Sequence, residues 1–113
     1  MLKGTLSGCI LAIIARKETY GYEIAETLSS HGFGKIAEGT IYPLLLRLEK
    51  NKLVITEYRA SELGPKRKYY SLTQLGAEEL ESFVKSYNEL CSAVNSTLEG
   101  GEIDEQRSKD TER

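Results

Sequence analysis

The sequence predicts a mainly α-helical chain with one small β-hairpin, and three observations carry that prediction. Apolar residues recur at three- and four-residue steps in three segments of residues 2–51, as in amphipathic helices. Two β-rich segments on either side of Gly64-Pro65 follow with a period of two. A heptad stripe then runs from Leu80 to Leu98. This order is that of a winged helix-turn-helix followed by one long C-terminal helix.

Length and composition restrict the classes of protein to which the chain can belong. A chain of 113 residues with 40% hydrophobic and 28% charged residues can build a self-sufficient core. Its longest apolar run, Cys9 to Ala15, is too short to span a membrane. Two cysteines cannot form a disulfide framework, which favours a cytoplasmic protein. A single histidine argues against a metal site, and no cofactor motif is present.

Charge divides the chain into unlike parts. Residues 1–73 hold 11 basic and 7 acidic side chains, whereas residues 74–113 hold 4 basic and 10 acidic ones. A basic first part favours an anionic partner for that part alone. We therefore expect a DNA-binding domain over 1–73, a dimerisation helix over 74–98 and a disordered polar tail over 99–113.

The first two predicted helices supply most of the apolar residues of the first part. One begins at Leu2 and ends near Arg16-Lys17, where cations suit the negative end of the helix dipole. The next runs from Tyr22 to Ser30, and residues 31–34 connect it to the third helix. His31 is interpreted as a polar helix-end residue, because no acidic or thiol neighbour suggests a site.

The third predicted helix, Thr40 to Asn51, has two different faces. Thr40 would cap it, and Pro43 would then stand at its third position, where no N–H is needed. One face is committed to the core, and the other is polar or aromatic. The core face holds Ile41, Leu44, Leu45 and Leu48, and the other holds Thr40, Tyr42, Pro43, Leu46, Arg47 and Lys50.

The hairpin and the fourth helix complete the predicted fold. Residues 53–59 and 66–72 form the two strands, and a turn over 61–65 places Lys66 and Arg67 at its tip. A charged edge strand is the alternative reading of these cations. Thr73 would cap the fourth helix at Gly76. A helix of about 25 residues is about 37 Å long, more than so small a domain can cover, so its stripe should pair with a second copy.

Three motifs closely resemble the PadR family of bacterial transcriptional regulators. They are Tyr20-Gly21-Tyr22-Glu23-Ile24, the stretch from Glu38 to Lys50, and the stretch from Arg67 to Thr73. The resemblance covers about residues 2–90, although Leu46 stands where members often carry a basic residue. It implies a homodimeric winged helix repressor that a small ligand or a stress signal relieves. It also implies that aromatic residues at the centre of the last helix line a ligand pocket.

These observations together predict a protein that binds pseudo-palindromic promoter DNA, with the third helix in the major groove. A winged helix that contacts only other proteins is the alternative, while an enzyme is disfavoured because no catalytic pair or phosphate loop is present. The predicted DNA-binding residues are Tyr20, Lys35, Thr40, Tyr42, Pro43, Arg47, Lys66 and Arg67. The predicted dimer interface holds Leu6, Ile10, Leu80, Phe83, Val84, Tyr87, Leu90, Cys91, Val94 and Leu98. Of these, Tyr87 and Phe83 are candidates to bind a planar apolar effector.

Overall fold

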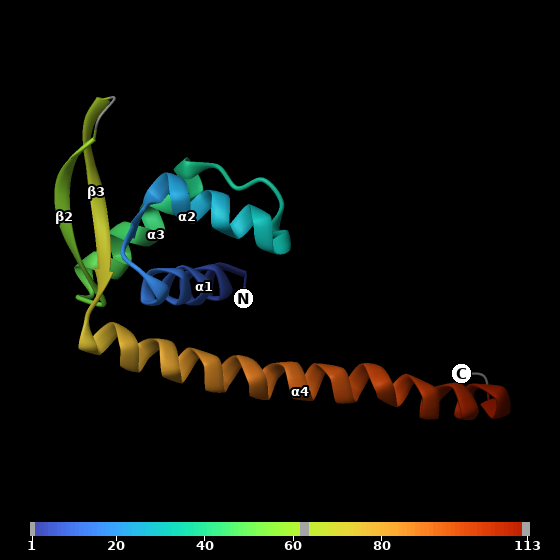
Figure 1. The fold of residues 1–113 in the computed structure, drawn as a ribbon. Helices are drawn as coiled ribbons and strands as arrows, with labels where there is room; N and C mark the ends of the chain where they lie inside the picture. Colours follow the sequence, from blue (N-terminus) through green and yellow to red (C-terminus); the bar gives the residue numbers. More distant parts are fainter. Residues whose placement is uncertain (1, 62–63, 112–113) are drawn as a thin grey trace. The chain divides into compact units, whose positions relative to one another are not determined.

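The structure is a computed structural model that describes the backbone of residues 2–61 and 64–111, and side chains within 4–61 and 64–100. It comprises two compact units, Met1–Glu81 and Ser82–Arg113. The predicted class is confirmed, since four helices accompany one small antiparallel sheet (Figure 1). The elements are α1 (Leu2–Arg16), β1 (Thr19–Tyr20), α2 (Gly21–Leu28), α3 (Glu38–Lys50), β2 (Val54–Ser61), β3 (Gly64–Leu72) and α4 (Gln74–Thr111).

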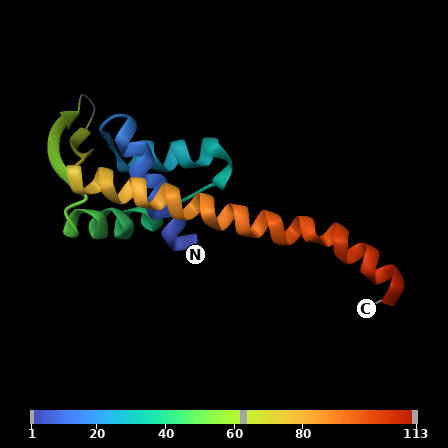
Figure 2. The same ribbon diagram turned by 90° about the horizontal axis from the view of Figure 1, so that it is seen from below.

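The core of the first unit lies where α1, α2 and α3 meet, with the hairpin of β2 and β3 at one end of these helices (Figure 2). Each helix contributes apolar residues at the spacing that the sequence indicated. Ile10, Ile24, Ile41 and Leu45 are completely buried. Burial of each such side chain stabilises the fold by about 1.5–3 kcal/mol. Helix α3 faces this core with Ile41, Leu44, Leu45 and Leu48, and its opposite face is exposed.

Helix α3 begins two residues earlier than the sequence predicted. Thr40 is not its cap, because the helix starts at Glu38 and the cap position is Ala37, whose carbonyl accepts the Thr40 N–H at 3.0 Å. Pro43 therefore lies inside the helix and not in its first turn. Its missing N–H leaves the Gly39 carbonyl without a helical donor from residue 43.

A short wide turn, Ser29–Phe33, joins α2 to the extended segment before α3. The sequence predicted a connection at residues 31–34, and the backbone of two glycines allows the chain to turn there. Gly32 and Gly34 have φ angles of 103° and 80°, which side-chain-bearing residues rarely adopt. The turn thus ends α2 and reverses the chain toward α3.

The sheet has the order β1-β3-β2, with both pairs antiparallel. Strand β1 was not predicted, and it pairs Thr19 with Tyr70 and Tyr20 with Tyr69. The hairpin is also longer than expected, since Ser61 pairs with Gly64. Lys66 and Arg67 therefore lie within β3 and not at the tip, which falls outside the described residues.

Helix α4 begins as predicted and ends later. The Gly76 N–H donates to Thr73 Oγ1 at 2.9 Å, which confirms Thr73 as the cap. The helix continues to Thr111, whereas the sequence predicted a disordered tail from Glu99. Several residues of this segment are good helix formers despite its polarity, and low hydrophobicity alone does not end a helix. The last predicted tail residues, 112–113, lie outside the described residues.

Candidate nucleic-acid interface

The outer face of α3 exposes several large side chains. Tyr42 and Leu46 expose 46% and 61% of their surface, and Thr40, Pro43 and Arg47 are also exposed. At 100° per residue, Thr40 and Arg47 share one side of this face while Tyr42 lies on the other. The predicted division of α3 into a core face and a free face is thus confirmed.

Beside Tyr42, a hollow of about 380 Å³ separates the start of α3 from the hairpin. Its lining combines aromatic rings with three cations and one carboxylate, so it is electropositive. Phenolic hydroxyl groups and cations are ligands of phosphate oxygens. The lining residues are Tyr20, Gly21, Tyr22, Glu38, Tyr42, Tyr58, Lys66, Arg67 and Lys68.

Close packing between Gly21 and Tyr42 shapes this hollow. A Cβ atom on Gly21 would lie 3.0 Å from Tyr42 Cε1, so a larger residue there would require the ring to shift by a few tenths of an ångström. Partial burial raises the pKa of the Tyr42 hydroxyl, and the charge and hydrogen bond of Glu38 raise it further. Tyr42 therefore stays a protonated donor at neutral pH.

Arg67 rests on an aromatic column that crosses the sheet. Its Cζ lies 4.4 Å from the centroid of the Tyr20 ring, and Tyr20 lies 5.3 Å from Tyr69. On the other side, Arg59 Cζ stands 4.6 Å from the Tyr69 centroid. Such contacts restrict a guanidinium without neutralising it. Arg67 is thus held in place while its charge remains available.

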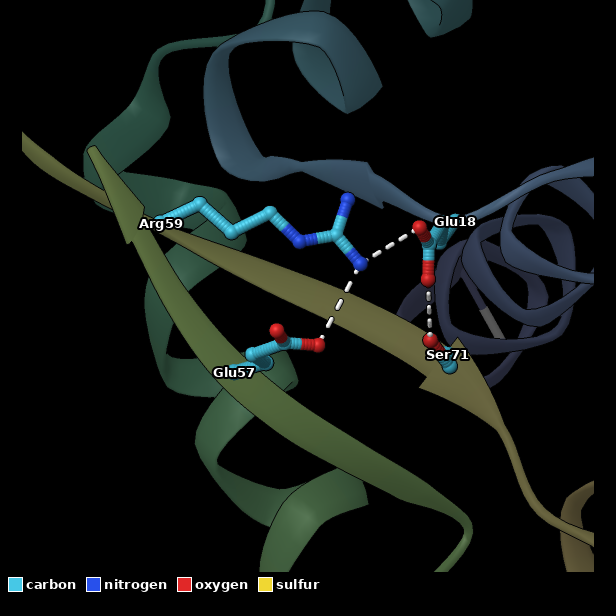
Figure 3. Close-up of polar contacts among 4 residues, drawn as sticks. All are labelled: Glu18, Glu57, Arg59 and Ser71. Atoms are coloured by element: carbon cyan, nitrogen blue, oxygen red, sulfur yellow. Dashed lines mark hydrogen bonds and ion pairs between the residues drawn. The ribbon is translucent and has the colours of Figure 1, made fainter. Parts of the chain in front are cut away.

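An ion cluster anchors the other end of this column to the segment after α1 (Figure 3). Arg59 pairs with Glu18 and, at 3.2 Å, with Glu57. Ser71 donates to the second Glu18 oxygen at 3.0 Å. The hydrogen bonds from Arg59 and Ser71 lower the pKa of the Glu18 carboxyl. The hairpin is therefore tied to the helical body through exposed but linked charges.

Lys68 has a different environment from Arg67. Its Nζ donates to Glu49 Oε1 at 2.9 Å, and Thr56 donates to the other oxygen at 3.2 Å. The hydrogen bond with Lys68 lowers the pKa of Glu49, and the same bond raises the pKa of Lys68. Because its charge is balanced, Lys68 joins α3 to the hairpin more than it attracts an anion.

The structure brings four of the eight predicted DNA-binding residues to this hollow, leaves Thr40, Pro43 and Arg47 on the exposed face of α3, and places one elsewhere. Tyr20, Tyr42, Lys66 and Arg67 line the hollow, and Pro43 lies next to Tyr42. Lys35 lies instead on a second hollow of about 600 Å³, whose lining includes Glu26 and Glu38. Direct contact of any of these residues with DNA stays a prediction.

Five residues that line the first hollow were not among the predicted DNA-binding residues: Gly21, Tyr22, Glu38, Tyr58 and Lys68. Tyr22 was predicted only as the first residue of the second helix, yet 54% of it is exposed and its hydroxyl donates to Glu26 Oε2 at 2.8 Å. The Glu26 partner four residues on could have indicated an outer position. Tyr58 was placed in a strand, and only the pairing of that strand brings it here.

The predicted dimer residues fall into two groups. Leu6 and Ile10 lie in the core of the first unit, 7% and 0% exposed, and so they offer little or no surface to another chain. Leu80 packs partly against the same core. Along the part of α4 in the second unit, an apolar stripe is at least partly exposed. It consists of Phe83, Val84, Tyr87, Leu90, Cys91, Val94 and Leu98.

Among the described residues, no group of three His, Cys, Asp or Glu side chains could hold a metal ion. None of the helices, over the same residues, is long and apolar enough to cross a membrane.

Similarity to known proteins agrees with this geometry. The model of the transcriptional regulator PadR-like family matches residues 10–82. A PadR-like transcriptional regulator from Bacillus cereus strain ATCC 14579 is 53% identical, with 88% of this chain and 97% of that chain covered and a TM-score of 0.79. A Streptococcus transcriptional regulator is 46% identical over 85% of this chain and 94% of its own, with a TM-score of 0.77. The transcriptional regulator Rv3488 of Mycobacterium tuberculosis is 34% identical over 85 residues, 75% of this chain and 78% of its own.

Proposed function

The chain belongs to the PadR-like family of transcriptional regulators, and we propose from this premise that it is a cytoplasmic homodimeric repressor of its promoters. As a family member it is a DNA-binding regulator and not an enzyme. In the proposed mechanism it occupies a pseudo-palindromic operator until a small molecule or a stress signal releases it. The observation that carries the proposal is the free face of α3 beside an electropositive, tyrosine-rich hollow.

Two kinds of DNA contact follow from this surface. The free face of α3 enters the major groove, where Thr40, Tyr42 and Arg47 reach base edges. Lys66 and Arg67 on β3 contact the phosphates of the adjoining strand. The first contacts select a sequence, whereas the second strengthen binding to every sequence.

The experiment compares two alanine variants on an operator duplex and on a random duplex. Arg67→Ala should weaken binding to both and lower the slope of affinity against salt by about one unit. Lys17→Ala removes the same charge away from the hollow and serves as the matched control. Tyr42→Ala should weaken operator binding more than random binding. Equal loss on the two duplexes would remove Tyr42 from the base-reading residues.

Dimerisation is proposed through the exposed stripe of α4. A row of apolar side chains at heptad spacing favours pairing with a second helix of the same kind. Val84→Glu with Val94→Glu would bury unpaired charges in such a pairing and should yield monomers in sedimentation. Ser92→Glu with Ser96→Glu adds the same charge to the opposite face and should leave dimers. If the valine pair still sediments as a dimer, the stripe is not the interface.

A planar apolar effector is proposed to act at the same helix. Phe83 and Tyr87 have ring centroids 6.0 Å apart with an interplanar angle of 28°, which presents two nearly parallel rings for stacking. A ligand that favours the non-binding state tenfold supplies about 1.4 kcal/mol, so derepression should be graded. Across a panel of planar aromatic compounds, Tyr87→Ala should lose the release from DNA that the wild type displays. An unchanged response would place the pocket elsewhere.

A further inference from the structure

Leu46 occupies an unusual position on the outer face of α3. It is 61% exposed and lies in the middle of the helix, with exposed Pro43 three residues before it and exposed Lys50 four residues after it. Helical geometry places these three side chains along one outward ridge. The buried residues Ile41 and Leu45 lie on the other side of the helix. The ridge opposite the buried face of α3 is thus apolar at its centre.

The chemistry of this ridge restricts what it can recognise. Leucine and proline side chains neither donate nor accept hydrogen bonds, so they cannot read the polar edges of base pairs. The thymine 5-methyl is the apolar group that a base pair presents in the major groove. A leucine pressed into that groove gains the most free energy where it buries such a methyl group.

We propose that Leu46, together with Pro43, is a specificity-determining surface that reads thymine 5-methyl groups. This inference rests on the proposed function, because it requires the free face of α3 to lie in the major groove. It adds a sequence rule to that function: each half-site carries a thymine beneath the centre of α3. The cation Lys50 flanks the apolar patch and holds it against the groove by attraction to phosphates.

The test replaces thymine by deoxyuridine, which removes the methyl group and leaves every hydrogen-bonding group of the base. The duplex is one that the wild-type protein enriches from a random pool, and thymines are replaced one at a time within one half-site. Wild-type affinity should fall about fourfold at one or two positions, the value of one buried methyl-sized group. Leu46→Ala should bind thymine and deoxyuridine equally at those positions.

Two further variants separate methyl reading from general weakening. Leu46→Asn keeps a similar size but is polar, and it should also lose the preference for thymine. Arg47→Ala should bind more weakly overall and retain the preference. Because Leu46 is exposed, its variants should melt at the wild-type temperature.

The outcomes distinguish this inference from the proposed function. Tight operator binding that is insensitive to deoxyuridine at every thymine would overturn methyl reading and leave the proposed function standing. A full thymine preference in Leu46→Ala would overturn it as well. Failure of the wild type to enrich any duplex would overturn both.

Discussion

Replacing Tyr20 by leucine should loosen Arg67 without removing any charge from the proposed DNA-binding surface. The Tyr20 ring makes one cation–π contact with Arg67 and one aromatic contact with Tyr69. At an exposed site the first stabilises by about 0.5–1 kcal/mol and the second by about 0.5–1.5 kcal/mol. We therefore expect Tyr20→Leu to lower the free energy of unfolding by about 1–2 kcal/mol.

The effect on DNA binding follows from the same geometry. An unsupported Arg67 must be ordered on binding, which costs about 1 kcal/mol or about fivefold in affinity. Fluorescence anisotropy with a labelled operator measures this loss at low and moderate salt. Tyr20→Phe keeps the ring and should bind almost as the wild type does.

A double-mutant cycle decides whether Tyr20 acts through Arg67. In the Arg67→Ala background, Tyr20→Leu should cause little further loss of affinity, because the side chain it positions is absent. An equal fivefold loss in both backgrounds would refute the reasoning and indicate that Tyr20 touches DNA itself. A large loss in Tyr20→Phe would point to its hydroxyl group as a phosphate ligand.

The remaining predictions concern stability. Gly76→Ala should destabilise the fold by about 3 kcal/mol in urea titrations, because the new methyl group would overlap the Leu53 carbonyl oxygen and lie 2.9 Å from a Leu72 methyl group. Gly39→Ala, where nothing lies within 4 Å, should leave stability equal or higher by up to about 1 kcal/mol. The hydrogen bond with Lys68 lowers the pKa of Glu49 in the folded protein, so Glu49 stabilises the fold at pH values above its ordinary pKa of 4.5. This contribution is lost as the pH falls through the pKa of the folded protein. Glu49→Gln should therefore flatten the acid side of the stability profile, and an unchanged profile would contradict the assignment.

The apolar spacing and the capping residues within single segments were sufficient to predict most of the helical body. The apolar spacing of α1 predicted its bounds, and the side chain of Thr73 caps Gly76 as its sequence position indicated. These features depend on residues within about one helical turn of one another. The same reasoning correctly separated the buried and free faces of α3.

Features that depend on distant segments could not be predicted in this way. Strand β1 has only two residues, too few for an alternating pattern, and exists because β3 pairs with it. The start of α3 was misplaced because Thr40 is a good cap by type, while Ala37 occupies the position without any side-chain bond. Tyr58 reaches the hollow only through the register of the hairpin.

Methylation protection of an operator tests the central claim most directly, because dimethyl sulfate modifies guanine N7 in the major groove. If the free face of α3 enters that groove in each protomer, bound protein should protect guanine N7 in two patches. The centres of these patches should lie about 10–10.5 base pairs apart. If the protein binds the duplex and every guanine N7 nevertheless stays fully reactive, the account is contradicted.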